Sequence, residues 1–115
     1  MKKDILFKKL QEGINTQDYL ILEQFCEIAA AEYPEENQTL LAQIAFANLN
    51  WSNEKVLEFT TRLAANNPEN VDYQLDLAEA QLKNYQQEPA VILLDSILAN
   101  NANNEQVVAR YIKII

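Results

Sequence analysis

The segment AAEYPEEN (residues 30–37) and the segment AANNPEN (residues 64–70) are nearly the same. In both, a pair of alanines precedes a proline, Pro34 or Pro68, and a glutamate follows it. We call the sequence distance from Pro34 to Pro68 the repeat interval. One further repeat interval reaches LANNANN (residues 98–104), in which an alanine replaces the proline. Because a residue before proline is pushed out of the helical region, the first two segments should end helices. The spacing predicts a structural unit that is one repeat interval long.

The composition favours helices along the whole chain. Of the 115 residues, 49% are hydrophobic, one is glycine and three are proline, so few residues are available for tight β-turns. Alanine, leucine, glutamate and glutamine are abundant, and all four are good helix formers. The length suits one domain with a sizeable core. We therefore predict a single all-α domain over residues 1–115.

Apolar residues recur at helical spacing in about seven segments, separated by short connections that predict antiparallel neighbours. We expect Gly13 to cap the C-terminus of the first helix and Asn15 or Thr16 to cap the N-terminus of the second. The third helix is expected to bury a face formed by Leu41, Ile44, Ala45 and Asn48. The expected helices are at about 2–12, 17–31, 37–49, 53–66, 71–84, 87–100 and 104–115.

The stretch from Val71 to Asn104 resembles one unit of the tetratricopeptide repeat (TPR) family, which has two antiparallel helices in about 34 residues. With Val71 as position 1, the large–small pair Leu77 and Ala78 falls at positions 7 and 8, and Ala90 falls at position 20. The resemblance implies a right-handed superhelical array. Its parts are units at about 3–36, 37–70 and 71–104 and a C-terminal helix at 105–115.

The repeats depart from the family pattern at several positions. Position 11, usually tyrosine, is occupied by Asn48 and Gln81, and position 27, usually alanine, by Leu63 and Ile97. The first helix of the second unit fits the pattern only after a shift of one residue. We interpret this shift as an extra residue in the loop around residues 50–52.

The charge balance restricts the class of partner. The chain has 17 acidic and nine basic side chains, a formal net charge of −8. Nucleic acid is not expected as a partner, because phosphate neutralisation needs clusters of Lys and Arg. A neutral or basic protein partner is electrostatically favoured. The alternative is an acidic surface that is merely solvated and keeps the protein in solution.

The sequence shows no arrangement of residues suited to catalysis. The absence of histidine removes the commonest general base and most zinc and iron ligand sets. A single glycine cannot form a phosphate-binding loop. Cys26 lies at helical spacing with Leu22 and Ala29, so we expect a core residue rather than a nucleophile. We predict a protein that is not an enzyme and has no catalytic, cofactor or metal site.

Targeting signals are weak at the sequence level. The N-terminal MKKDILFKKL has a basic start, but its apolar run of three residues is too short for a signal peptide. No segment approaches the roughly 18 apolar residues of a membrane span. A lone cysteine cannot form an internal disulfide. We expect a cytoplasmic protein without a membrane partner.

TPR arrays bind a peptide or helix in a groove that the first helix of each pair lines. The resemblance implies an adaptor or co-chaperone-like module, and the stretches at 66–82 and 90–101 are similar to the TPR half attached to some bacterial thioredoxin-like chaperones. The alternative is that the first and last helices cover the groove and make its residues part of the core. The implied groove residues are Thr39, Ala42, Phe46, Leu49, Asn50, Asp72, Leu75, Glu79, Leu82 and Lys83.

The C-terminal stretch VVARYIKII (residues 107–115) is more apolar than the last helix of a repeat array requires. Exposed apolar patches usually mark an interface. An alternative function is therefore self-association, in which this helix forms a homodimer. The residues expected to take part are Val107, Val108, Tyr111, Ile112 and Ile115.

Overall fold

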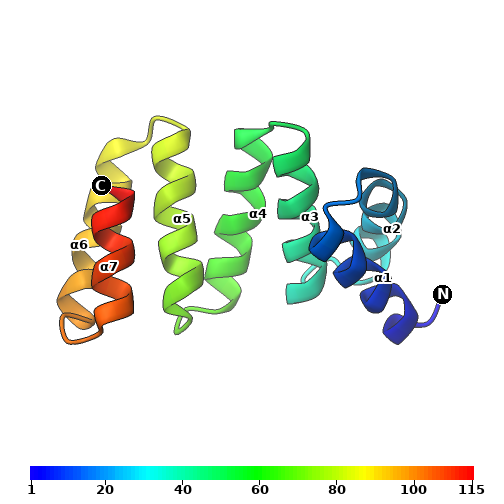
Figure 1. The fold of residues 1–115 in the computed structure, drawn as a ribbon, viewed down its shortest axis with the longest axis horizontal. Coiled ribbons are helices and arrows are strands. Elements are labelled where there is room, and N and C mark those ends of the chain that lie inside the picture. Colours follow the sequence, from blue (N-terminus) through cyan, green and yellow to red (C-terminus); the bar gives the residue numbers. More distant parts are fainter. The chain divides into compact units, whose positions relative to one another are not determined.

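The computed structural model describes residues 1–115 and contains seven α-helices and no β-strand, packed in consecutive pairs, which confirms the all-α fold class (Figure 1). No helix combines the length and the apolar content that a membrane crossing requires. The helices are α1 (Lys3–Thr16), α2 (Tyr19–Glu32), α3 (Asn37–Leu49), α4 (Asn53–Asn66), α5 (Val71–Lys83), α6 (Gln87–Asn100) and α7 (Glu105–Ile114).

The helix boundaries recur at the repeat interval. The odd-numbered helices begin at positions 3, 37, 71 and 105. The even-numbered helices begin at positions 19, 53 and 87, which is the same spacing. The chain thus consists of three helix pairs, and α7 has the place of the first helix in a further pair.

The extra residue that we expected around residues 50–52 is not present. The start of α3 lies one repeat interval after that of α1 and one before that of α5, which leaves no room for an insertion. The expected buried face of α3 is also wrong, because Asn48 is exposed and Leu41, Ile44 and Ala45 are only half-buried. Apolar side chains occur on all sides of this helix, so their spacing does not define one face. The residues that α3 buries are Thr39, Leu40, Ala42 and Ala47.

The turn inside each helix pair has the same backbone conformation. One residue in each turn is in the left-handed region, namely Gln17, Trp51 and Tyr85, with φ of 52°, 57° and 61°. The next amide N–H donates to a carbonyl five residues earlier, as in a Schellman motif. These bonds join Asp18 to Gly13 (3.0 Å), Ser52 to Ala47 (3.0 Å) and Gln86 to Gln81 (2.8 Å). The repeat therefore extends to the backbone hydrogen bonds of the turns.

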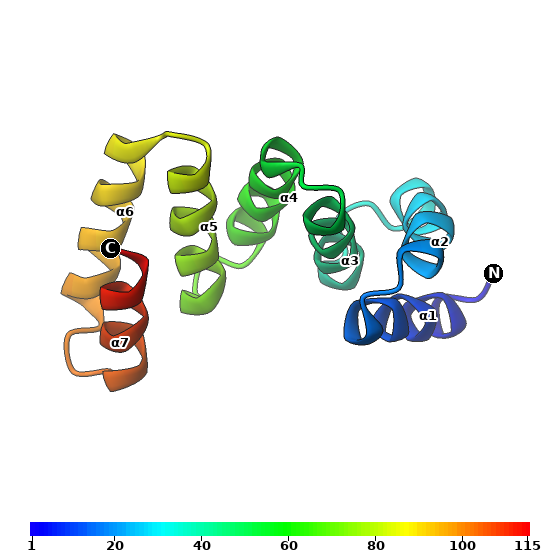
Figure 2. The same cartoon turned by 45° about the horizontal axis from the view of Figure 1, so that its top comes forward.

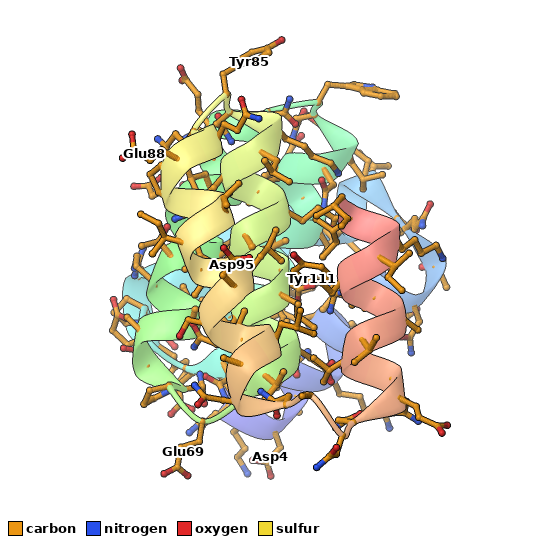
Figure 3. The ribbon with its side chains drawn as sticks, turned by 90° about the vertical axis from the view of Figure 1, so that its left-hand side faces the viewer. Asp4, Glu69, Tyr85, Glu88, Asp95 and Tyr111 are labelled. Atoms are coloured by element: carbon orange, nitrogen blue, oxygen red, sulfur yellow. The ribbon has the colours of Figure 1, made fainter.

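Replacing Tyr85 with glycine should raise the free energy of unfolding by about 1 kcal/mol, because a left-handed backbone costs a residue with a Cβ roughly that much. The Tyr85 side chain is 96% exposed and projects away from the helices, so little packing is lost (Figure 3). Urea denaturation followed by circular dichroism measures the effect. Tyr85→Val, which is β-branched, should instead lower the stability. A Tyr85→Gly variant no more stable than Tyr85→Ala would contradict this account.

The ends of α1 and α2 differ from the sequence-based expectation. α1 continues through Gly13, and no glycine has a positive φ, so Gly13 is not a C-cap. A Cβ at Gly13 would lie 3.0 Å from side-chain atoms of both Ile21 and Leu22, which shows that the glycine permits a close contact with α2. The N-cap of α2 is Asp18 rather than Asn15 or Thr16, and its carboxylate accepts a hydrogen bond from the Ile21 amide at 3.2 Å.

The asparagine-rich segments serve as helix starts. The Asn70 side chain accepts a hydrogen bond from the Tyr73 amide at 3.0 Å and caps α5. Asn104, one repeat interval later, accepts a bond from the Val107 amide at 3.2 Å and caps α7. α4 ends two residues before Pro68, as we predicted. Each repeated segment thus ends one helix pair and begins the next helix.

The chain divides into two compact units, residues 1–63 and 64–115, and the boundary between them lies within α4. In the first unit, α1, α2 and α3 pack against one another (Figure 2). Their shared core consists of Leu6, Leu10, Leu22, Cys26, Ala29 and Ala42. In the second unit, α5, α6 and α7 pack together. Their core consists of Leu75, Ala78, Leu94, Ile97 and Val107.

Candidate partner-binding site

Three of the expected groove residues are buried. Thr39 and Ala42 have no exposed surface, and Leu75 is nearly as buried. Ala42 belongs to the core that Leu6 and Leu10 of α1 complete, and Leu75 belongs to the core that includes Val107 of α7. The outer helix of each unit therefore covers Ala42 and Leu75. This is the arrangement that the sequence left open as the alternative to a groove.

The acidic groove residues on α5 face an arginine of α7. The Arg110 guanidinium pairs with the Asp76 carboxylate and lies 3.8 Å from Glu79 Oε2 and 4.0 Å from Asp72 Oδ1. It also donates a hydrogen bond of 3.2 Å to the backbone carbonyl of Asp72. Each of these partly exposed ion pairs contributes about 1 kcal/mol or less. Together they join α7 to the side of α5 on which the groove was expected.

The remaining groove residues differ in their surroundings. Leu82 is half-buried against the core of the second unit, and Lys83 is exposed. Leu49 and Phe46 are half-buried against the core of the first unit. The Phe46 ring also contacts the Tyr19 ring of α2, with 5.1 Å between the ring centroids. Phe46 and Leu49 each line a hollow in the structure, and the hollow at Phe46 is the larger of the two.

A pocket with a volume of about 440 Å³ lies in the first unit, between α2, α3 and the beginning of α4. We call it the Phe46 pocket. Its apolar lining comes from Cys26, Phe46, Ala47 and Phe59. The exposed side chains that border it include two carboxylates and one ammonium group, on Glu23, Glu27 and Lys55. The pocket thus combines an apolar interior with a charged edge.

One residue of the Phe46 pocket lining has a buried side-chain oxygen without a hydrogen-bond partner. Gln43 lines the pocket, and its side-chain Oε1 atom is buried and accepts no hydrogen bond. An unpaired buried polar atom costs roughly 1–3 kcal/mol. At the edge of the pocket, a hydrogen bond to the Glu23 carboxylate raises the pKa of Tyr19.

Cys26 lines the Phe46 pocket as a neutral thiol. The side chain is buried, and the chain has no second cysteine with which it could pair. Burial raises the pKa of the Cys26 thiol from an ordinary value of 9.0 to about 12. The reactive thiolate is therefore scarce at neutral pH. The geometry agrees with the expectation of a core residue.

The Cys26 thiol should make the stability depend on pH above about 9. Its pKa is higher in the folded than in the unfolded chain, so its contribution is complete below pH 9 and is lost as the pH rises toward 12. The difference in unfolding free energy between wild type and Cys26→Ala should fall by about 1 kcal/mol from pH 8 to pH 10. Urea denaturation of both proteins at several pH values measures it. A difference that is constant with pH would contradict a buried thiol.

The residues expected for self-association also divide into buried and exposed groups. Val107 is a core residue, and Val108 and Tyr111 are half-buried. The Tyr111 hydroxyl donates to the Asp95 carboxylate of α6 at 3.4 Å. Ile112 and Ile115 are 64% and 72% exposed. Only the last two are unpartnered apolar side chains.

The sequence did not indicate most of the Phe46 pocket. Its lining comes from three helices and the turn between α3 and α4, and only Phe46 and Asn50 were among the expected site residues. The sequence does show two glutamates at helical spacing, Glu23 and Glu27 on α2, which could indicate a site. Such pairs also occur on solvated helix faces, so they did not distinguish one. The structure shows no group of three or more His, Cys, Asp or Glu residues arranged to hold a metal ion.

In comparisons with known proteins, no family model, no curated protein and no solved structure matches the chain. The function must therefore be inferred from the geometry of the chain itself.

Proposed function

We propose that this protein is a non-enzymatic, TPR-like interaction module. In this proposal it binds a peptide or helix of another protein and takes one apolar side chain of that partner into the Phe46 pocket. The regular recurrence of helices and turns at the repeat interval supports the TPR-like assignment. The free, buried thiol of Cys26 suits a reducing compartment, and we place the protein in the cytoplasm as part of the same proposal.

The single observation that supports binding most directly is the Phe46 pocket. Its volume of about 440 Å³ lies within the range of roughly 300–1,000 Å³ that is typical of ligand pockets. Burying one leucine or phenylalanine side chain there contributes about 1.5–3 kcal/mol.

The charges around the pocket define the partner further. Glu23 and Glu27 contribute two carboxylates, against one ammonium group from Lys55. The net charge of the chain is −8, so a partner with basic residues is favoured over an acidic one. We therefore infer a partner segment in which Lys or Arg lies next to the inserted apolar side chain.

Selection from a random-peptide display library against the wild-type protein tests this proposal. Selected peptides should share a large apolar residue with a neighbouring Lys or Arg. Ala47 lines the pocket, so Ala47→Leu places a larger side chain inside it. Calorimetry should then show that this variant binds the selected peptides at least tenfold more weakly. The matched control is Ala31→Leu, an exposed position on α2 outside the pocket, and it should leave the affinity unchanged.

The charged edge is tested with a Glu23→Gln/Glu27→Gln double variant. It should weaken binding mainly at low salt, because exposed charges are screened as ionic strength rises. Peptides that bind Ala47→Leu as tightly as wild type would overturn the pocket as the binding site. Failure to select any peptide would overturn the proposed function.

A further inference from the structure

Trp51 is a residue whose type the packing of the fold does not explain. It lies in the turn between α3 and α4 and is 92% exposed, so its side chain adds almost nothing to the core. Its φ of 57° is in the left-handed region, which is unfavourable for a bulky side chain. A glycine would suit this position better. A large aromatic residue that is unfavourable for folding and packs against nothing is a candidate for a role in binding.

The turn that contains Trp51 belongs to the wall of the Phe46 pocket. Asn50 and Ser52, the residues on either side of Trp51, both line the pocket. The Asn50 side chain donates a hydrogen bond of 3.0 Å to the Phe46 carbonyl. The Ser52 amide donates one of 3.0 Å to the carbonyl of Ala47, which is also a pocket residue. The backbone at Trp51 is therefore held in place relative to the pocket.

A short series of contacts connects one pocket carboxylate with this turn. The Glu23 carboxylate accepts a hydrogen bond from Tyr19. The Tyr19 ring contacts the Phe46 ring, and the Phe46 carbonyl accepts the hydrogen bond from Asn50. Glu27, the other carboxylate that borders the pocket, lies one helical turn further along α2. Glu23 is therefore the carboxylate that we expect to act together with Trp51.

The chemistry of these groups selects a cation. The face of an indole ring is electron-rich and attracts cations more strongly than the rings of tyrosine or phenylalanine do. The exposed side chains that border the pocket contribute two carboxylates against the one ammonium group of Lys55. A basic side chain of a bound peptide thus finds both an aromatic face and a carboxylate at this end of the pocket.

The first unit already contains one guanidinium group between an aromatic ring and a carboxylate. The Arg62 guanidinium lies over the Phe59 ring, 5.7 Å from the ring centroid, and pairs with the Glu35 carboxylate. Phe59 also lines the Phe46 pocket. A planar guanidinium can stack on a ring while its N–H groups donate to acceptors at its edge, whereas the ammonium group of lysine is a compact point charge. This arrangement favours arginine over lysine as the partner of an indole beside a carboxylate.

We propose that the Trp51 indole binds an arginine of the peptide whose apolar side chain occupies the Phe46 pocket. The guanidinium lies flat on the ring and donates a hydrogen bond to Glu23. This inference rests on the proposed function and makes it more specific, because Trp51 becomes the residue that selects arginine as the basic neighbour. The peptide belongs to a separate protein with basic residues, which the net charge of −8 favours over a second copy of this acidic chain.

Trp51→Gly separates binding from stability. It should raise the melting temperature, because glycine is favourable at a positive φ. By calorimetry, it should bind the tightest peptide from the display selection at least about fivefold more weakly, as expected for a residue that dominates an interface. The matched control is Tyr85→Gly at the equivalent turn of the second unit, which should leave the affinity unchanged. Equal losses for both variants, or no loss for Trp51→Gly, would overturn the role of Trp51.

An exchange of arginine for lysine tests the chemistry of the contact. The same peptide is synthesised with arginine or with lysine at its basic position. Wild type should bind the arginine form about two- to fivefold more tightly, which is the contribution of a cation–π contact at an exposed site. Trp51→Gly should bind the two forms equally. A preference for arginine that persists in Trp51→Gly, or no preference in wild type, would overturn the proposal.

The two pocket carboxylates provide a second matched pair. Glu23→Gln should weaken binding of the arginine peptide more than Glu27→Gln does, although both variants remove one charge from the edge of the pocket. Equal effects of the two variants would overturn the assignment of Glu23 as the carboxylate that acts with Trp51.

Ala47→Leu distinguishes a failure of this inference from a failure of the proposed function. Peptides that Ala47→Leu weakens and Trp51→Gly does not would leave the Phe46 pocket as the binding site and would overturn only the role of Trp51. Peptides that neither variant weakens would overturn both. In sedimentation analysis we expect a monomer, and a concentration-dependent dimer that Trp51→Gly abolishes would overturn the assignment to a separate protein.

Discussion

Replacing Leu22 with alanine should lower the free energy of unfolding by about 2–5 kcal/mol, the cost of a cavity in a well-packed core. Leu22 is fully buried in the core of the first unit, together with Leu6 and Leu10 of α1. Its side chain also lies against Gly13, where a Cβ would come within 3.0 Å of it. These contacts of Leu22 all lie on α1, a helix that cannot move freely toward α2. The space left by the missing atoms therefore cannot close fully. Urea denaturation followed by circular dichroism measures the loss.

The matched control for this variant is Leu20→Ala on the same helix. Leu20 is largely exposed, so its replacement removes little packing, and we expect a change within about 0.5 kcal/mol. The two variants delete the same atoms from α2 and differ only in burial. Equal losses for both would show that the core of the first unit is not packed as described.

Replacing Ala78 with leucine should lower the free energy of unfolding by about 1–3 kcal/mol, because extra methylene groups overpack a filled core. Ala78 on α5 and Ala90 on α6 are fully buried small residues in one helix pair. Ala78 packs in the core with Leu94 and Ile97 of α6. Helix axes approach closely only where the contacting side chains are small. A leucine at this position should force the two helices apart.

The control for Ala78→Leu is Ala99→Leu, which makes the same change at an exposed position of α6. We expect Ala99→Leu to leave the stability within about 0.5 kcal/mol of wild type. Thermal unfolding of both variants shows the difference directly. An unchanged melting temperature for Ala78→Leu would mean that α5 and α6 have room for a larger side chain.

The positions of the helices could be predicted because local chemistry determines them. Pro34 and Pro68 limit the helices before them, and Asn70 and Asn104 cap the helices after them. These effects act within a few residues and need no knowledge of the packing. The repeat interval follows from their spacing. The same kind of local reasoning gave the seven helices and the all-α fold class.

Predictions from the local sequence were wrong where contacts between helices determine the structure. Glycine is the residue type that usually caps a helix C-terminus, which is why we expected a cap at Gly13. In the structure Gly13 instead allows Leu22 of α2 to approach α1 closely, and sequence periodicity does not show this contact. Asn48 was assigned to a buried face because α3 is apolar on all sides, and only packing against α1 and α2 selects the true face. The register of such a helix cannot be determined from its own residues.

The binding residues were harder to predict than the fold. The expected groove followed family positions, but whether Ala42 and Leu75 are open depends on α1 and α7, which are far away in the sequence. Arg110 pairs with Asp76, a full repeat interval earlier, and nothing in the local sequence indicates that contact. The Phe46 pocket draws on three helices. No contiguous motif marks such a site.

The turn between α3 and α4 provides an optical probe without any label. Trp51, the single tryptophan, is 92% exposed at this turn, so its indole emission should resemble that of tryptophan in water and should change little on unfolding. Its neighbours Asn50 and Ser52 line the Phe46 pocket. A peptide that fills the pocket and extends over this turn would cover the indole and should shift its emission to shorter wavelength. The fluorescence of Trp51 should therefore change little on unfolding but should change on binding.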